Sequence, residues 1–384
     1  MEQFVLNCKD QILAKLVAFS KGPYWHVRLA LICTLLAISV AFPSYYYFTK
    51  PAATLSGNWK AISAQIDSPL ATQQHAPEMH ESKIAFRLLM PVLGRLIPSE
   101  SVKMRIGVLL FLQHIVGLLF YVFVAKWVEK LCGDKVIAVL VCFSFAFTFI
   151  GKSFFWDMEG FFDGVAFFLA FMAIYQYGIF TFVFLFLSFW VDERAIIASP
   201  LIYLYLRGTR GEMKLGELIK VDSVLCGYLG TVAGYIIIRT ALSHYCGLHI
   251  PVSSGSAGGM HAWKQWPMLA MGIITPMSFF WFLLLIYSLF LLRNRKYAFV
   301  LLFGAALFVV NLAAFSVIDF TRSAAYELIA IFAALHALLE SSSVEFGRSI
   351  LLRICVVNAF IPGMYLMTQL YWMYPVIPHI IIFR

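Results

Sequence analysis

The sequence predicts an all-α protein embedded in a membrane as a polytopic helical bundle of about eleven spans. Three observations support this prediction: 61% of the 384 residues are hydrophobic, only 13% are charged, and the mean hydropathy is +0.84. Soluble chains are typically about 45–50% apolar and about 25% charged, so this chain has too few polar residues to cover a water-soluble globule. A lipid bilayer is therefore expected to surround most of its surface.

Apolar runs separated by charged residues define the candidate spans. Each run is too long for a strand and lacks a two-residue alternation, so each is expected to be helical. The runs at 178–191 and 195–206 are short for a hydrocarbon core of roughly 30 Å, and are either half-helices or a broken, re-entrant pair. The runs lie at 28–48, 106–125, 136–150, 161–177, 178–191, 195–206, 221–241, 268–292, 297–317, 323–339 and 350–372.

Residues 1–27 precede the first span and do not have the pattern of a signal peptide. Apolar pairs alternate there with Lys9, Lys15 and Lys21. This pattern is typical of an amphipathic helix that lies on the cytoplasmic membrane surface. The first span is then an uncleaved anchor, and residues 1–384 are expected to form a single integral membrane domain.

The distribution of Lys and Arg predicts the orientation of the spans. If the N-terminus is cytoplasmic, the inner segments hold most of the basic residues, and the short outer segments hold few. The net charge of +9 is explained by this bias, and no basic stripe interleaved with aromatics indicates a nucleic-acid partner. Two longer segments, 49–105 and a flexible loop at 242–267, are then expected on the outer side.

Cysteines and nucleotide-binding motifs exclude several kinds of protein. Of the seven cysteines, only Cys246 falls in a predicted outer loop, and no CxxC pair is present. A disulfide framework is therefore not expected. The sequence also contains neither GxxxxGK[ST] nor GxGxxG, which argues against ATP or a nucleotide-sugar bound by those motifs.

Ionisable residues gather in four connections on the predicted outer face: the long loop and the turns at 151–163, 191–194 and 318–322. Ionisable residues beside spans are costly and indicate function by default, although salt bridges between spans are the structural alternative. Asp319 and Arg322, three residues apart, can simply pair. The candidate residues are Asp67, Asp157, Glu159, Asp163, Asp192, Glu193 and Asp319 among the acids, with Arg87, Arg194 and Arg322.

The spacing of Glu159 and Asp163 suggests a catalytic pair. They are four residues apart, so they share a helix face if the span begins near residue 159. Two carboxylates on one face fit a general base, a divalent-cation site, or one base with a structural neighbour. Whether the site binds a divalent cation therefore stays open. A second group in the long loop has residue types that bind metals but matches no defined metal motif: His75, Glu78, His80 and Glu81.

Residues 84–97, with the sequence IAFRLLMPVLGRLI, are predicted to form an amphipathic helix on the outer surface. Such a helix can lie along the lipid interface and present Arg87 or Arg95 to a phosphate headgroup. Together with the outer carboxylates, this set has the groups required for transfer of a sugar from a lipid-phosphate donor. A carboxylate accepts the proton of the acceptor hydroxyl, carboxylates stabilise the oxocarbenium-like sugar, and arginines or a divalent cation neutralise the leaving phosphate.

Four segments, in order along the chain, resemble the GT-C superfamily of multi-span glycosyltransferases, particularly the bacterial branch that uses polyprenyl-phosphate sugars. They are FRLLMPVLGRL, FFDGVAFFLAF, VDERAIIASPL and DFTRSAAYE. The resemblance implies an inverting transfer to a glycan or lipid-linked acceptor on the periplasmic face of a bacterial inner membrane. The family usually carries an acidic residue soon after its first span, whereas here the first acid after that span is Asp67.

Roles follow from this resemblance. Asp67, Glu159 and Asp163 are candidates for the base or a metal site, with Glu193 and Asp319 as supporting carboxylates. Further substrate-binding candidates are Arg87, Arg194 and Arg322 for the donor phosphate, with Asp157 and Asp192 beside them. The expected partners are a lipid-linked sugar donor, a glycan or lipid acceptor and the bilayer.

Two other functions remain as alternatives. An O-antigen or capsule polymerase also handles lipid-linked sugars, but is expected to have arginine-rich outer loops. A transporter or flippase for a lipid-linked sugar or another solute places its polar residues near the bilayer midplane, often with internal repeats, which are not evident here.

Overall fold

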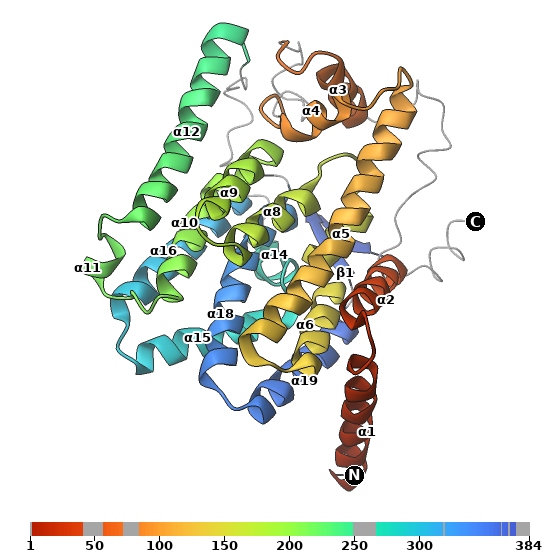
Figure 1. Ribbon diagram of the computed structural model, residues 1–384, viewed down its shortest axis with the longest axis vertical. Helices are drawn as coiled ribbons and strands as arrows, with labels where there is room; N and C mark the ends of the chain where they lie inside the picture. The colour runs from red at the N-terminus through yellow and green to blue at the C-terminus, as the bar shows by residue number, and fades with distance from the viewer. Residues whose placement is uncertain are drawn as a thin grey trace.

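The computed structural model describes residues 2–40, 57–71, 84–248, 266–317, 319–361, 363–367 and 369–373. Within these ranges the chain is a helical bundle with one two-stranded hairpin. Figure 1 shows α3 and α4 at the top of the bundle and α1 at the bottom, and we call these the upper and lower ends. The long helix α5 (Val102–Cys132) runs from the upper to the lower end, and α12 (Ser223–Cys246) returns to the top.

The other elements follow the same order as the apolar runs. The first half contains α1 (Glu2–Ser20), α2 (Trp25–Val40), α3 (Gly57–Asp67), α4 (Leu89–Arg95), α6 (Lys135–Phe147), α7 (Phe149–Trp156), α8 (Asp163–Tyr175), α9 (Ile179–Val191), α10 (Arg194–Gly208) and α11 (Leu215–Leu218). The second half contains η4 (Trp266–Met268), α14 (Leu269–Ile274), η5 (Ser278–Phe280), α15 (Trp281–Arg293), α16 (Tyr297–Ser316), α17 (Phe320–Ala324), η6 (Ala325–Glu327), α18 (Leu328–Ser341), α19 (Val344–Phe360), β1 (Gly363–Met367) and β2 (Gln369–Met373).

Among the described residues, four helices are long and apolar enough to cross a membrane: Val102–Cys132, Ser223–Cys246, Tyr297–Ser316 and Phe320–Ser341. The number rises to six if two bent pairs each count as one span. These pairs are Lys135–Phe147 with Phe149–Trp156, bent by 62°, and Trp266–Ile274 with Ser278–Arg293, bent by 87°. The structure therefore supports an all-helical bundle with four to six candidate spans.

Helix length explains the difference from the eleven predicted runs. Helices α8 and α9 have 13 residues each. At about 1.5 Å per residue such a helix is roughly 20 Å long, against a hydrocarbon core of about 30 Å. The runs are mainly helical in the described parts of the chain, but 136–150 is interrupted at Thr148, 268–292 is interrupted at 275–277, and the last run differs most.

The prediction of one helix over 350–372 is wrong. Helix α19 ends at Phe360, and β1 then pairs with β2 in antiparallel register, with Gly363 opposite Met373. Pro362 in the sequence lacks an N–H group and disfavours the helical conformation of the residue before it. An apolar run alone does not distinguish this arrangement from a continued helix.

The 84–97 prediction is confirmed only in its second half. Helix α4 begins at Leu89, and the residues before it form a turn and an extended segment. Arg87 therefore lies outside the helix. This allows its side chain to point into the protein instead of along the lipid interface, as described below.

Close packing of aromatic side chains fixes the position of α7 and therefore of the turn that follows it. The Phe120 ring on α5 lies 5.1 Å from the Phe154 ring on α7, between centroids. A Cβ atom at Gly117 would lie 2.6 Å from Phe154 Cβ, and one at Gly164 would lie 2.7 Å from Phe154 Cδ1. The two glycines thus let Phe154 fit between α5 and α8, and α7 ends at the upper side of the bundle.

Candidate functional site

Helices that alternate in direction bring ionisable residues together at the upper end. Helices α7 and α9 finish there, and α8, α10 and α17 begin there. Their end residues meet in one group although they are far apart in sequence. We call this group the charged cluster; it consists of Arg87, Asp163, Asp192, Glu193, Arg194, Asp319 and Arg322.

Asp163 is the centre of the charged cluster. It is the first residue of α8, and its side chain is 2% exposed. Arg322 donates to it through Nε, and also through Nη2 at 2.9 Å, while Arg194 Nη2 donates at 2.8 Å. The helix N-terminus favours a negative charge at this position, and two guanidinium groups supply the hydrogen bonds of the Asp163 side chain.

The turn between α9 and α10 forms the second part of the charged cluster. Asp192 accepts from the Arg194 Nε atom at 2.9 Å and from the Arg194 backbone N–H at 3.0 Å. Glu193 accepts from Arg87 through Nε at 3.1 Å and Nη2 at 3.3 Å. Burial alone raises the pKa of Asp192, but the charges of Arg194 and Arg87 outweigh burial and hold its pKa well below the ordinary value.

Arg322 connects α17 to the rest of the charged cluster. Its Nη1 atom donates to Asp319 Oδ2 at 2.8 Å, and its Cζ atom lies 3.6 Å from the centroid of the Phe161 ring. Arg194 also reaches α17, because its Nη1 atom donates to Ser323 Oγ at 2.9 Å. The three arginines therefore join four separate parts of the chain.

Asp157 shapes the turn at 157–162. It is buried, and it accepts from the backbone N–H groups of Glu159 at 3.1 Å and of Phe162 at 2.7 Å. Gly160 and Phe162 have positive φ values of 85° and 59°, so the chain cannot be helical there. Burial, followed by the charge of Asp163, raises the pKa of Asp157 to about 7.

This turn overturns one expectation from the sequence. Helix α8 begins at Asp163, so Glu159 and Asp163 do not share a helix face. Glu159 lies instead on the exposed side of the turn. Residues four apart share a face only in a helix. Here the backbone N–H groups that donate to Asp157 and the positive φ values at Gly160 and Phe162 stabilise a turn instead.

The structure places the ten candidate residues in three groups. Seven form the charged cluster, and Asp157 and Glu159 lie in the turn beside it. Asp67 is apart: its side chain is 59% exposed and pairs with Arg105. The histidine-containing group at 75–81 and the central part of the 242–267 loop lie outside the described residues.

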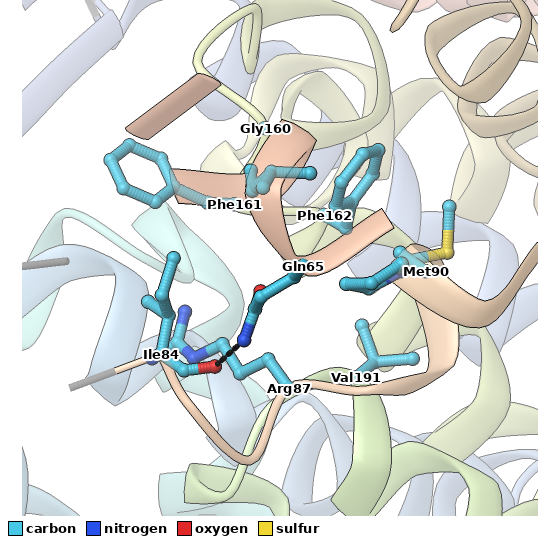
Figure 2. A pocket seen from close by; sticks show the side chains of 10 residues that line it. Gln65, Ile84, Arg87, Met90, Gly160, Phe161, Phe162 and Val191 are labelled. Carbon is cyan, nitrogen blue, oxygen red and sulfur yellow. Dashed lines mark hydrogen bonds between the residues drawn. The ribbon is translucent and has the colours of Figure 1, made fainter. Parts of the chain in front are cut away.

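A small cavity lies between the turn, α4 and the charged cluster. Figure 2 shows Arg87 and Gln65 beside each other, with Phe161 and Phe162 on the opposite wall. The cavity has a volume of about 20 Å³, enough for about one water molecule. Gln65 Nε2 donates to the Ile84 carbonyl at 3.1 Å. Two other polar atoms, Arg87 Nη1 and Gln65 Oε1, are buried and have no hydrogen-bond partner within the described ranges.

The described residues contain no group of three or more His, Cys, Asp or Glu side chains arranged to hold a metal ion. In the charged cluster, the carboxylates of Asp163 and Asp192 are occupied by arginines. The geometry therefore offers a cation no ligand set in these segments.

Sequence reasoning missed two cations near this end. Arg239 on α12 packs on Phe86, with Cζ 4.4 Å from the ring centroid, and donates to Tyr235 OH at 3.0 Å. Lys152 on α7 is 2% exposed. A single charge within an apolar helix was the available signal for both.

The upper end thus combines the three paired arginines of the charged cluster, the exposed carboxylate of Glu159 beside them, and a cavity lined by Arg87 and Gln65. The nature of the substrate has to be inferred from this arrangement. Neither a protein-family model, nor a curated protein, nor a solved structure matches this chain.

Proposed function

We propose that this chain is a GT-C-like membrane glycosyltransferase. It transfers a sugar from a polyprenyl-phosphate donor to a glycan or lipid-linked acceptor on the periplasmic face of a bacterial inner membrane. The observation that carries this proposal is the convergence of ionisable residues from four chain segments at one end of a lipid-compatible bundle. The chain crosses the membrane about eleven times in this proposal, and its N-terminus is cytoplasmic.

Arg87 is the residue best suited to bind the donor phosphate. Its Nε and Nη2 atoms are held by Glu193, whereas Nη1 is buried without a hydrogen-bond partner in the described ranges, and the residue lines the cavity. A buried guanidinium N–H with no acceptor favours an anionic ligand, since hydrogen bonds to phosphate oxygens are charge-assisted. Arg194 and Arg322 are occupied by Asp163, so their role is to fix the shape of the site.

Glu159 is the residue best suited to act as the base. Asp163 and Asp192 are each paired with two arginines, so neither side chain is free to approach an acceptor hydroxyl. Glu159 is exposed, and the next two residues, Gly160 and Phe161, line the cavity. Its carboxylate is therefore accessible to an acceptor hydroxyl that approaches the same opening.

The proposed reaction is a single displacement. Glu159 takes the proton of the acceptor hydroxyl as its oxygen bonds to the anomeric carbon of the sugar. The bond between that carbon and the phosphate oxygen breaks, and its electron pair remains on the polyprenyl phosphate. Arg87 stabilises the additional negative charge, and the configuration at the anomeric carbon is inverted.

A sugar ring is larger than the cavity of about 20 Å³, so substrate entry requires the 157–162 turn to move away from Arg87. The turn is bonded to α3, where Trp59 Nε1 donates to the Met158 carbonyl at 2.8 Å, and to α5, where Gln113 Nε2 donates to the Asp157 carbonyl at 3.0 Å. Entry of the substrate therefore requires the Gly160 and Phe161 part of the turn to separate from Arg87 and Arg322.

The packed centre of the bundle favours an enzyme over a transporter. The Phe332 ring lies 4.7 Å from the Phe171 ring and 5.3 Å from the Phe145 ring, between centroids. Transport sites generally lie near the midplane, where helices are interrupted. The charged cluster lies at helix ends instead.

The test compares the masses of surface glycans from cells with and without the chain, and then from cells that carry variants. We expect loss of one hexose or pentose without the chain. Glu159→Gln should reduce transfer by about 100-fold or more, which is typical of a lost general base. Glu345→Gln, which changes an exposed carboxylate on α19, should restore the glycan fully.

Two results would contradict the proposal at different levels. Unchanged glycans with altered uptake of a solute would exclude transfer and favour transport. Full transfer by Glu159→Gln would remove Glu159 as the base while leaving the reaction class in place.

A further inference from the structure

Two large cavities meet at the lower end of the bundle. One, of about 700 Å³, lies between the lower parts of α5, α8, α9, α10 and α12, and the other, of about 420 Å³, lies between α10, α15 and α18. Both are lined by Tyr205, Thr209, His336 and Glu340. Each is within the range of roughly 300–1,000 Å³ that is usual for small-molecule sites.

The lengths of α5 and α10 give the distance between these cavities and the charged cluster. Along α5, Gln113 donates to the Asp157 carbonyl at the upper end, and Lys130 lines the larger cavity. Along α10, Arg194 lies in the charged cluster, and Thr209, which follows the helix, lines both cavities. Both separations correspond to roughly 25 Å at about 1.5 Å per residue, close to the thickness of the hydrocarbon core. The cavities therefore lie at the opposite membrane interface.

The larger cavity is bordered by free positive charge. Lys130 and Arg210 are both exposed, and neither forms an ion pair within the described ranges. The Lys130 ammonium lies 4.8 Å from the centroid of the Tyr177 ring and donates to Tyr177 OH at 3.4 Å. Only one carboxylate, Glu340, lines this cavity. An anionic ligand is thus favoured.

The surface next to the cavity is suited to hydrocarbon chains. On α9, which contributes the wall at Ile179 and Phe182, the side chains of Ile179, Phe180 and Val183 are exposed. On α12, Leu229 is exposed two residues after Gly227, which lines the cavity. These exposed apolar side chains suit contact with lipid chains, and Tyr175 and Tyr177 at the cavity are aromatic residues typical of a membrane interface.

We propose that this pair of cavities binds an anionic phospholipid of the adjacent leaflet. Lys130 and Arg210 contact its phosphate, the headgroup occupies the larger cavity, and its acyl chains lie against α9 and α12. Basic pockets between membrane helices recognise anionic headgroups in this way. The site does not depend on the function of the charged cluster, which lies at the opposite end.

The test uses the purified full chain and native mass spectrometry, with phosphatidylglycerol and phosphatidylcholine added in equal amounts. We expect phosphatidylglycerol to bind at least about tenfold more tightly than phosphatidylcholine. Lys130→Gln combined with Arg210→Gln should reduce phosphatidylglycerol binding by about tenfold or more. Lys126→Gln combined with Arg293→Gln is the matched control, because these exposed basic residues do not line either cavity; it should bind as the wild type does.

Equal binding of the two lipids, or unchanged binding by the Lys130 and Arg210 variant, would overturn the proposal. A third arm adds inorganic phosphate as a competitor. If it displaces the lipid at equal concentration, the cavity takes a soluble phosphate compound and the lipid assignment is wrong. Each single variant should show a smaller loss than the pair, which keeps the test valid if the double variant is unstable.

Discussion

The two ends of the bundle use charge in opposite ways. At the upper end, Arg322 is buried, Arg87 and Arg194 are largely buried, and each contacts at least one carboxylate, with a cavity for about one water beside them. At the lower end, Lys130 and Arg210 are exposed and unpaired in the described ranges, beside a cavity of about 700 Å³. Buried paired charges fix the positions of helices, whereas unpaired charges remain available to a ligand. The groups of the upper end that the proposed reaction uses are Glu159, which is exposed, and Arg87, whose Nη1 atom has no hydrogen-bond partner in the described ranges.

The largest effect should come from removing the centre of the charged cluster. Asp163→Ala leaves Arg194 and Arg322 buried without their shared partner. Breaking a buried ion pair on one side typically costs about 3–5 kcal/mol, so the melting temperature of the purified protein should fall sharply. Glu345→Ala, at an exposed position on α19, should change stability by less than about 0.5 kcal/mol. Similar melting temperatures for the two variants would show that the pairs do not hold the upper end together.

A pair of glycines tests the difference in packing between the two ends. Gly160 and Gly211 both have positive φ, 85° and 73°. A Cβ atom at Gly160 would lie 2.6 Å from Ile62 Cδ1, whereas one at Gly211, which lines the smaller lower cavity, meets nothing within 4 Å. Gly211→Ala should cost about 1–2 kcal/mol from the backbone alone. Gly160→Ala should cost roughly 1–3 kcal/mol more from overpacking. Equal losses in thermal unfolding would contradict this contrast.

The smallest predicted effect is a pH dependence at the upper end. The pKa of Asp157 in the folded protein is raised to about 7. Between the ordinary pKa of an aspartate and pH 7, the folded state therefore keeps a proton on Asp157, whereas the unfolded state has lost it. The resulting stability is fully present below the unfolded pKa and is lost as the pH rises through 7. The melting temperature should therefore fall by a few degrees between pH 5 and 8, more in the wild type than in Asp157→Asn. An identical pH dependence in both proteins would exclude Asp157 as its source.

Much of the upper end could be predicted from the sequence, because ionisable residues beside apolar spans are costly to retain. That rule identified the six residues of the charged cluster that lie in short turns, and alternation of the spans predicted one face for them, whereas Arg87 was selected from the amphipathic pattern at 84–97 and the resemblance there. The 157–162 turn could not be predicted, since it depends on hydrogen bonds from Asp157 to the backbone and on a positive φ at Phe162. Spacing alone therefore gave the wrong relation between Glu159 and Asp163.

The lower end was not predictable in the same way. Its cavities arise where the ends of several helices fail to pack together, and that depends on tertiary geometry instead of local pattern. Lys130 and Arg210 were recognisable from the sequence only as basic residues that indicate the inner side. The contact of Arg239 with Phe86 was not predictable, because these two residues become neighbours only when α12 packs against the segment before α4.

The most direct test is the sidedness of the two ends. Single cysteines are introduced as Glu159→Cys or Arg210→Cys in a background with Cys226→Ser and Cys246→Ser, and intact spheroplasts are treated with a membrane-impermeant maleimide. Both positions are exposed, and the parent without an introduced cysteine gives the background labelling. We expect Glu159→Cys to be labelled in intact spheroplasts, and Arg210→Cys only after the membrane is permeabilised. The reverse pattern, or labelling of both from outside, would place the charged cluster on the wrong face for the proposed reaction.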